Sequence, residues 1–469
     1  MFRRDRKHWQ RIAAIALAGM LALAGLLGTK PRGVLAGPGG YSFAAIAFLD
    51  SPAPGGGNFT FDFEPYGIND RGDVAFVADV TTGGEGVFVR RQGQTSQIAR
   101  AGLPAPGAGT FGTLDLGRSA LNNEGDVAFA LTLEPFTFPL GVNAGLYRFS
   151  QKDQTTSAVV LPGVTPAPGG GTFAGIYFDT SINNRGDLVF SGIVTGADID
   201  PSTDPGFDGL GMGVFRADKY GHIFSEVKPG DPAPGGGTFD NAWHGWINEG
   251  SDIAFGAHVE GEECIAGAPQ SVAVVCSESV YLKKAGTGAI QSIAHQGAPA
   301  PGGGVYRLAF GPVVNDQGDI VFIGDLTPAP DMGDALGVFL FSKGRTIAVA
   351  RPGDPMPGGG NLVRASFQPS NYHLNNKGDV SFSAALDTDD NSDGIKDTGM
   401  YIFSNGSMRL VARTGTVIPG LGTIAYLGLA PLVPFPSGTG AIINEQGKVL
   451  LFATLEDGRA VLMVATPKP

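Results

Sequence analysis

Residues 68–76 read Ile-Asn-Asp-Arg-Gly-Asp-Val-Ala-Phe, and related stretches recur six more times along the chain. Each copy has an apolar residue, then Asn-x-x-Gly or a near match, then a strand-like run. The Asn side chain accepts backbone hydrogen bonds in a turn, and Gly adopts the positive φ that closes it. Each copy therefore predicts a hairpin between two strands. The marker Asn residues are Asn69, Asn122, Asn183, Asn248, Asn315, Asn375 and Asn444.

A second repeated motif precedes the first one. Residues 52–57 read Pro-Ala-Pro-Gly-Gly-Gly, and similar blocks precede five of the other markers. Pro restricts φ and Gly relaxes it, which suits a crossing from the outer strand of one sheet to the inner strand of the next. Further strand-like runs follow each marker, for example 86–90 and 98–100. Each unit therefore predicts four short strands.

The repeat period determines the fold class. Successive marker Asn residues are 53 to 69 positions apart, and there are seven of them. This pattern predicts an all-β, seven-bladed β-propeller with four-stranded blades over residues 37–469. The last unit ends at a third strand, 461–464, whereas residues 46–49 match a fourth strand. We therefore expect the N-terminal strand to complete the last blade and close the ring.

The markers resemble those of bacterial exported tandem-repeat proteins named for the pattern NxxGxxAF, which carry varied anchors. Gly72, Ala75 and Phe76 match that pattern, whereas the fourth unit has Ser251 in the Gly position and the seventh ends in Leu-Leu at 450–451. The resemblance covers residues 40 to 466. It implies export and a repeat fold, and it implies no activity because that family has none established.

Composition and charge exclude several classes of protein. The chain has 469 residues, of which 42% are apolar, so it can bury a large core and is not a disordered tail. A basic segment followed by the apolar run 12–27 predicts a signal peptide over residues 1–36, with an uncleaved membrane anchor as the alternative. Its removal would change the net charge from −12 to −18. Such a surface repels nucleic acid and anionic lipid, so neither is an expected partner.

The expected setting is therefore outside the cytoplasm, in the periplasm, on the cell surface or secreted, with a monomeric chain. The chain has two cysteines, Cys264 and Cys276, and export favours a disulfide between them over a metal site.

An insertion in the sixth unit resembles a calcium loop. Asp389, Asn391, Asp393, the carbonyl of Ile395 and Asp397 have the spacing of the first nine positions of an EF-hand-type loop. Position twelve is Met400, so the usual bidentate acid is missing and weak binding is expected. The pattern favours a structural Ca²⁺, and a solvated acidic loop is the alternative.

Propellers bind ligands over the central channel, so inner-strand residues that depart from the repeat are candidate ligand contacts. They combine acids, arginines, histidines and aromatics, as a site for carbohydrate or another small polar ligand would. The alternative is that these side chains only fill the channel. The residues are Glu64, Tyr66, Arg118, Asp179, Trp243, His244, Trp246, Arg307, Tyr372 and His373.

We therefore expect a binding or structural module at the cell exterior, with carbohydrate or an extracellular protein as its partner. The alternative function is a carbohydrate-active hydrolase or lyase over the channel, with Glu64 and Asp179 as acid and base. A third hypothesis is a protein-interaction platform on the loop around Cys264 and Cys276.

Overall fold

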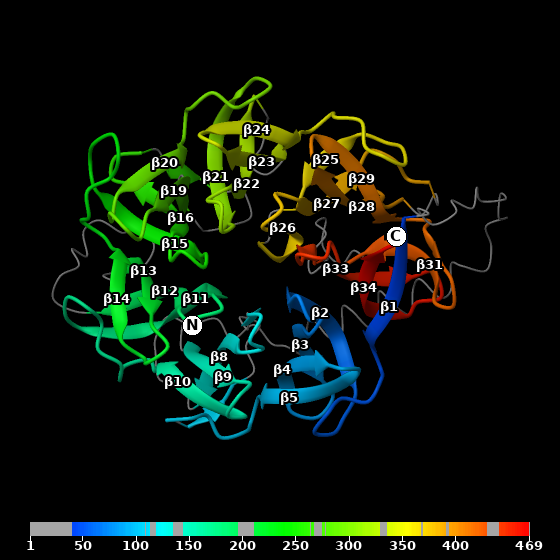
Figure 1. The fold of residues 1–469 in the computed structure, drawn as a ribbon, viewed down its shortest axis with the longest axis horizontal. Coiled ribbons are helices and arrows are strands. Elements are labelled where there is room, and N and C mark those ends of the chain that lie inside the picture. Colours follow the sequence, from blue (N-terminus) through cyan, green and yellow to red (C-terminus); the bar gives the residue numbers. More distant parts are fainter. Residues whose placement is uncertain are drawn as a thin grey trace.

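The computed structural model describes residues 40–107, 109–112, 119–134, 144–195, 211–262, 264–266, 274–276, 278–328, 335–366, 369–390, 394–428 and 440–468. Seven antiparallel sheets surround a common axis (Figure 1). Within the described residues there is no α-helix, and no helix is long and apolar enough to span a membrane. The fold is the predicted all-β, seven-bladed propeller.

The first three blades follow one another along the chain, and in blades 1 and 3 the first strand lies nearest the axis (Figure 1). Blade 1 contains β2 (Phe59–Ile68), β3 (Val74–Val80), β4 (Gly84–Arg91) and β5 (Gln94–Arg100); blade 2 contains β6 (Thr110–Phe111), β7 (Ser119–Leu121), β8 (Val127–Glu134), β9 (Ala144–Ser150) and β10 (Thr155–Val160); blade 3 contains β11 (Thr172–Ile182), β12 (Leu188–Thr195), β13 (Gly211–Ala217) and β14 (Ile223–Val227). In blade 2 two short strands, β6 and β7, take the place of the first strand and both pair with β8.

The next three blades repeat this order, with an additional two-stranded arm between the second and third strands of blade 4. Blade 4 contains β15 (Phe239–Ile247), β16 (Ile253–Val259), β19 (Ser279–Lys283) and β20 (Ile290–Ala294), and its arm contains β17 (Cys264–Ala266) and β18 (Val274–Cys276); blade 5 contains β21 (Val305–Val314), β22 (Ile320–Thr327), β23 (Leu336–Ser342) and β24 (Arg345–Ala350); blade 6 contains β25 (Leu362–Ala365), the 3-10 turn η1 (Pro369–Asn371), β26 (Tyr372–Leu374), β27 (Val380–Leu386), β28 (Thr398–Ser404) and β29 (Ser407–Arg413).

Blade 7 closes the ring. It contains β30 (Val417–Ile418), β31 (Gly422–Leu427), β32 (Ile442–Ile443), β33 (Val449–Leu455) and β34 (Ala460–Pro467), and its outermost strand is β1 (Tyr41–Phe48). β1 pairs antiparallel with β34, from Tyr41 opposite Pro467 to Phe48 opposite Val461. The predicted closure by the N-terminal strand is confirmed.

The Pro-x-Pro-Gly-Gly-Gly blocks form tight loops that connect consecutive blades. In the first one, Pro52 bridges Asn58, the Ala53 amide donates to the Gly57 carbonyl, and all three Gly residues have positive φ. An Arg at the end of the outer strand holds three of these loops: Arg100 donates to Gly56 O, Arg351 to Gly303 O and Arg413 to Gly359 O. We call the face with these loops the loop face. The opposite face, with the Asn-x-x-Gly turns, is the turn face.

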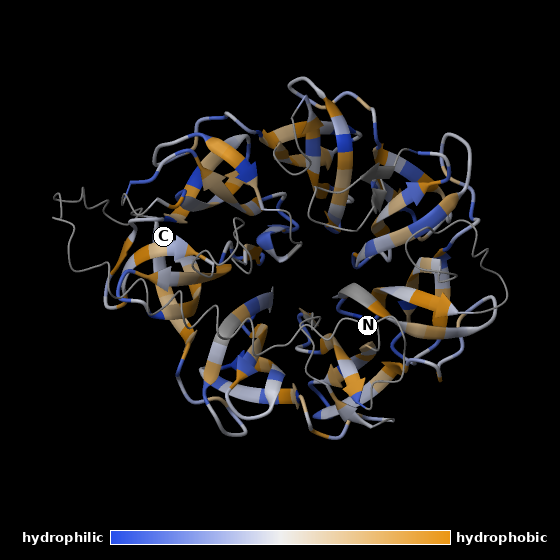
Figure 2. Ribbon diagram, turned by 180° about the vertical axis from the view of Figure 1, so that it is seen from behind, coloured by the Kyte–Doolittle hydropathy of each residue, from blue (hydrophilic) through white to orange (hydrophobic). Residues whose placement is uncertain are grey.

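The core lies within and between the blades, because the second strand of each blade is apolar along most of its length, as in β3 and β16 (Figure 2), and is buried on both faces against the neighbouring sheets. Most blades have a cluster of aromatic rings in the same place. In blade 1, Phe76 stacks on Phe88 at 5.5 Å, and Phe59 contacts both rings.

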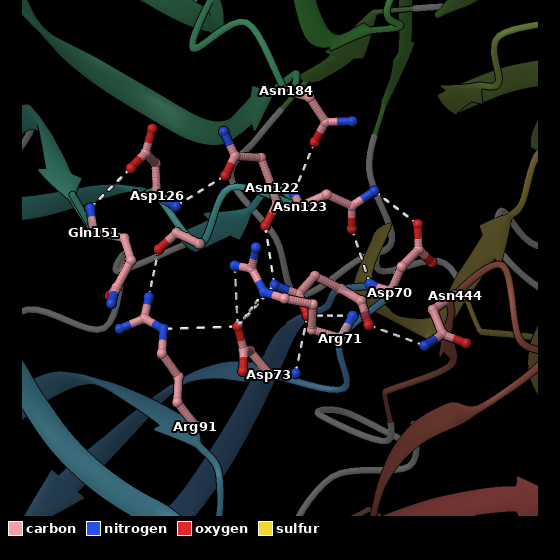
Figure 3. Close-up of polar contacts among 12 residues, drawn as sticks. Asp70, Arg71, Asp73, Arg91, Asn122, Asn123, Asp126, Gln151, Asn184 and Asn444 are labelled. Atoms are coloured by element: carbon pink, nitrogen blue, oxygen red, sulfur yellow. Dashed lines mark hydrogen bonds and ion pairs between the residues drawn. The ribbon is translucent and has the colours of Figure 1, made fainter.

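The marker Asn residues join the blades as well as forming the turns. Asn122 Oδ1 accepts the Asp126 amide at 2.8 Å (Figure 3). Its Nδ2 donates to the Asn183 carbonyl of the next blade at 3.0 Å. The same Nδ2 bond joins every blade to the next, and Asn444 Nδ2 returns to Asn69 O at 2.9 Å. We call this closed circle the marker ring.

A second circle lies beside the marker ring and has the opposite donor pattern. The backbone amide after each marker donates to the side chain of the corresponding residue in the next blade, as Asp70 N does to Asn123 Oδ1 at 2.8 Å (Figure 3). The circle continues through every blade and returns from Glu445 N to Asp70 Oδ1 at 3.0 Å. Each blade is therefore held to both neighbours at the turn face.

Candidate functional site

The inner strands of four blades break register at a similar height. The pairing shifts between Pro65 and Gly67 in β2, Tyr177 and Thr180 in β11, Trp243 and Trp246 in β15, and Phe310 and Val313 in β21. A β-bulge redirects side chains, and bulges are frequent beside binding sites. Tyr66, Asp179 and His244 all lie within these breaks.

In blade 6 the inner strand is interrupted instead of bulged. Residues 369–373, from η1 into β26, extend toward the axis, and we call them the plug (Figure 1). Asn371 Oδ1 accepts the Gly440 amide at 3.0 Å and Ser370 O accepts the Ala441 amide at 2.8 Å, both in blade 7. Tyr372 Oη donates to Gly311 O in blade 5 at 2.6 Å. The plug therefore joins several blades near the centre of the ring.

Blade 1 contributes a carboxylate and a phenol. The Tyr66 hydroxyl donates to Glu64 Oε2, and both side chains are half-buried. Both residues belong to β2, the strand of blade 1 nearest the axis (Figure 1). Glu64 and Tyr66 therefore form one hydrogen-bonded pair that a ligand at the axis could contact.

Blade 4 contributes the most elaborate group. His244 Nδ1 lies 3.0 Å from Glu278 Oε1, and the two side chains are 20% and 10% exposed. His244 has φ of 53°, a left-handed conformation that costs a non-Gly residue free energy and is frequent at functional sites. The Trp243 ring lies 6.4 Å from the His244 ring.

Glu278 was not predicted from the sequence. It precedes the third strand of its blade, and nothing in the repeat pattern relates that position to the inner strand. Its side chain passes over Gly256, where an added Cβ would overlap Glu278 Oε1. Only Gly at position 256 leaves room for this path.

Trp246 and His373 come together across blade 5. Their ring centroids are 5.4 Å apart, although Trp246 belongs to blade 4 and His373 to the plug. Burial lowers the pKa of His373 to about 4, so its ring is neutral at pH 7. His373 Nδ1 has no hydrogen-bond partner among the residues that the structure describes.

Two predicted ligand contacts have roles within the protein. Arg307 Nε lies 3.1 Å from Asp325 Oδ2, and the Asp325 side chain is fully buried. Tyr372 is also fully buried and is held by its bond to Gly311. A ligand could reach Tyr372 only if the plug moved. Arg118 and the side chain of Asp179 lie outside the described residues, and so does the predicted signal peptide.

The predicted calcium loop is described in part, because Asn391 and Asp393 lie outside the described residues. Arg413, which is 1% exposed, donates to Asp397 Oδ2 at 3.0 Å and to Asp390 Oδ2 at 2.7 Å. Asp397 Oδ1 has no hydrogen-bond partner in the described part of the chain, and Asp389 Oδ2 accepts the Gly394 amide. No three His, Cys or acidic side chains gather into a metal site among the described residues.

The two cysteines face each other in the arm of blade 4. Cys264 pairs with Cys276 in the antiparallel register of β17 and β18. Their side chains lie outside the described part, so the disulfide stays a prediction.

Among solved structures the chain is similar to oligogalacturonate lyase from Vibrio parahaemolyticus, with 11% identity over 93% of this chain and 98% of that one, at a TM-score of 0.48. It is similar to the β-propeller domain of the Trilobed protease from Pyrococcus furiosus, with 10% identity over 87% and 98% and a TM-score of 0.45. A Mycobacterium tuberculosis puromycin-hydrolyzing peptidase has 13% identity over 90% and 53%, also at 0.45.

No curated protein matches the sequence. A family model described as a family of unknown function (DUF7453) matches twice in tandem, over residues 10–209 and 207–462. These two matches span nearly the whole chain, which therefore belongs to the DUF7453 family.

Proposed function

We propose that this chain is an exported binding propeller that recognises a saccharide between the plug and the inner strands of blades 1, 3 and 4. The observation that supports this most is the shared level of the register breaks, where Tyr66 and His244 lie beside half-buried Glu64 and Trp243. Sugar rings present C–H faces that stack on indole rings and hydroxyls that bond to carboxylates. A mixture of aromatic and polar groups suits such a ligand.

The contacts fix the orientation of two carboxylates that can accept sugar hydroxyls. Glu64 accepts from Tyr66, and Glu278 is bonded to His244, so each carboxylate has a neighbour that holds it in place. An acid–base pair of Glu64 and Asp179 is the alternative, and it requires release of fragments from the bound polymer.

The test is to incubate the purified protein with bacterial and plant polysaccharides and peptidoglycan, and to record retained protein and released fragments together. Retention that falls at least tenfold in Glu64→Gln and Trp243→Ala supports the proposal. Tyr220→Ala, an exposed residue on the outer edge of blade 3, is the matched control and should bind normally. Fragment release abolished by Glu64→Gln would favour the enzyme, and no retention at all would refute a saccharide site.

Export is part of the same proposal, as is placement among the NxxGxxAF tandem-repeat proteins. A signal peptide over residues 1–36 predicts that protein recovered outside the cytoplasm begins near residue 37. Mass spectrometry of that protein tests the cleavage, and an intact N-terminus held in the membrane fraction would indicate an anchor instead.

We further propose that the loop of blade 6 binds a structural Ca²⁺ through Asp389, Asn391, Asp393, Ile395 O and Asp397. If so, millimolar Ca²⁺ added after EDTA raises the unfolding temperature by about 3 °C. Asp389→Ala should abolish this increase, whereas Asp457→Ala, on an exposed hairpin of blade 7, should not. An unchanged unfolding temperature in the parent protein would exclude the site.

A further inference from the structure

The contact between Trp246 and His373 lies nearer the turn face than the rest of the candidate site. Each of these two residues precedes its marker Asn by two positions, whereas Glu64 and Trp243 precede theirs by five and His244 by four. Because every inner strand runs from the loop face to its marker, a smaller offset means a position closer to the turn face.

Blade 5 allows this contact to form. Its inner strand has Gly311 and Pro312 at the register break, and Val313, at the height of Trp246, is 1% exposed. Trp246 packs against the apolar clusters that contain Val313 and Val314, so its ring crosses in front of β21 to reach His373. The plug is joined to blade 7 on its other side through Asn371 and Ser370.

We infer that the Trp246–His373 pair and the plug close the site toward the turn face, so that a ligand enters only from the loop face. A site with one entrance accepts the end of a chain, whereas a site open at both ends or along a groove accepts internal segments. The ligand is therefore a terminal unit of a saccharide chain. This inference rests on the proposed function and specifies which part of the saccharide is bound.

The chain has a convenient reporter for the test. It has three tryptophans, and Trp243 and Trp246 both lie in the candidate site, while the third is Trp9. In the full chain with Trp9→Phe, intrinsic tryptophan fluorescence therefore reports only on the two indole rings beside the bound ligand.

The defined probes are maltohexaose and α-cyclodextrin, which contain the same glucose units and linkage but differ in having or lacking ends. Each polysaccharide that the protein retains is also titrated before and after partial acid hydrolysis, at equal mass. End recognition predicts at least tenfold tighter half-saturation by mass after hydrolysis, and no response to α-cyclodextrin at concentrations where any linear oligomer saturates.

Equal half-saturation before and after hydrolysis, or saturation by α-cyclodextrin, would overturn end recognition while leaving the proposed saccharide site intact. No fluorescence change and no retention with any saccharide would overturn the proposed function, and this inference with it. Trp246→Ala should remove the preference for hydrolysed polymer. If Trp246→Ala fails to fold, Trp246→Phe is the second variant; it keeps an aromatic ring at this position and should retain the preference. The comparison of probes on the parent chain requires no variant.

Discussion

Ser251 occupies the one marker turn in which Gly is replaced. It adopts φ of 62°, a left-handed conformation like that of the marker Gly residues, whose φ values run from 73° to 88°, and its hydroxyl accepts from Arg185. The turn therefore forms in spite of the side chain, and other interactions in the blade offset the free energy that the left-handed conformation costs.

Ser251→Gly should consequently stabilise the protein by about 0.5–1 kcal/mol, because relief of the left-handed strain exceeds the added entropy of the unfolded chain. Chemical denaturation measures the change. Gly186→Ala, at the equivalent turn of blade 3, is the matched control and should destabilise. A lower stability for Ser251→Gly would mean that the contact with Arg185 outweighs the strain.

His373 should make stability depend on pH. Its folded pKa of about 4 lies below the ordinary value of 6.5, so only the unfolded chain takes up the proton between these values. Stability from this group is present above pH 6.5 and is lost as the pH falls toward 4, by about 3 kcal/mol at most. His373→Gln should unfold with a shallower acid slope over this interval, and an unchanged slope would contradict the burial of the ring.

His258 should make stability depend on pH in the opposite direction, with stability lost as the pH rises. Burial alone would lower its pKa, but the hydrogen bond and charge of Asp240 and the carbonyl of Glu262 raise it overall. Its contribution to stability is therefore complete below pH 6.5 and declines as the pH rises through the higher folded value.

At the scale of the element, the Asn-x-x-Gly turn is also a joint between blades. The contacts within one unit were predictable from the sequence, because they are local. They are the hydrogen bonds that the Asn Oδ1 accepts from backbone amides and the positive φ of Gly. The bond from Nδ2 joins residues at least 53 positions apart, and no local pattern specifies where that amide group will point.

Asn122→Asp separates the two roles. The carboxylate can still accept the Asp126 amide, but it cannot donate to Asn183 O and places a negative charge beside that carbonyl. We expect a loss of about 1–3 kcal/mol of unfolding free energy, because Asn122 is buried. Glu124→Gln, exposed in the same turn, is the control. If both variants are equally stable, the bond between blades contributes nothing.

The candidate site was predictable in part. Residues that depart from the repeat on the inner strands identified Glu64, Tyr66, Trp243 and His244, because a repeat defines what each position would otherwise hold. The plug could not be predicted in the same way, since the contacts that hold it come from blades 4, 5 and 7, which are distant in the sequence. Likewise Glu278 reaches His244 only because Gly256 leaves space beneath it.

At the scale of the whole molecule, closure depends on β1. The fold and its closure were predictable because seven similar units leave one strand missing at the end and one in excess at the start. Without β1, the edge of β34 would expose unpaired backbone groups, and such edges pair with other chains.

Deletion of residues 41–48 should therefore lower the unfolding temperature by more than about 5 °C and cause self-association. Calorimetry and size-exclusion chromatography measure the two effects. Deletion of residues 1–36, which precede β1 in the sequence, is the control. A monomeric protein with an unchanged transition would show that blade 7 is complete without its outer strand.

The two circles of hydrogen bonds at the turn face also bear on how such a protein evolves. Every blade offers its successor the same contacts that it receives from its predecessor, so a duplicated gene segment brings a compatible joint with it. The inner strands take no part in that joint before their last residue. New units can thus be copied in and their axial residues diversified by mutation, while the turns keep the hydrogen bonds that join each unit to its neighbours at this face.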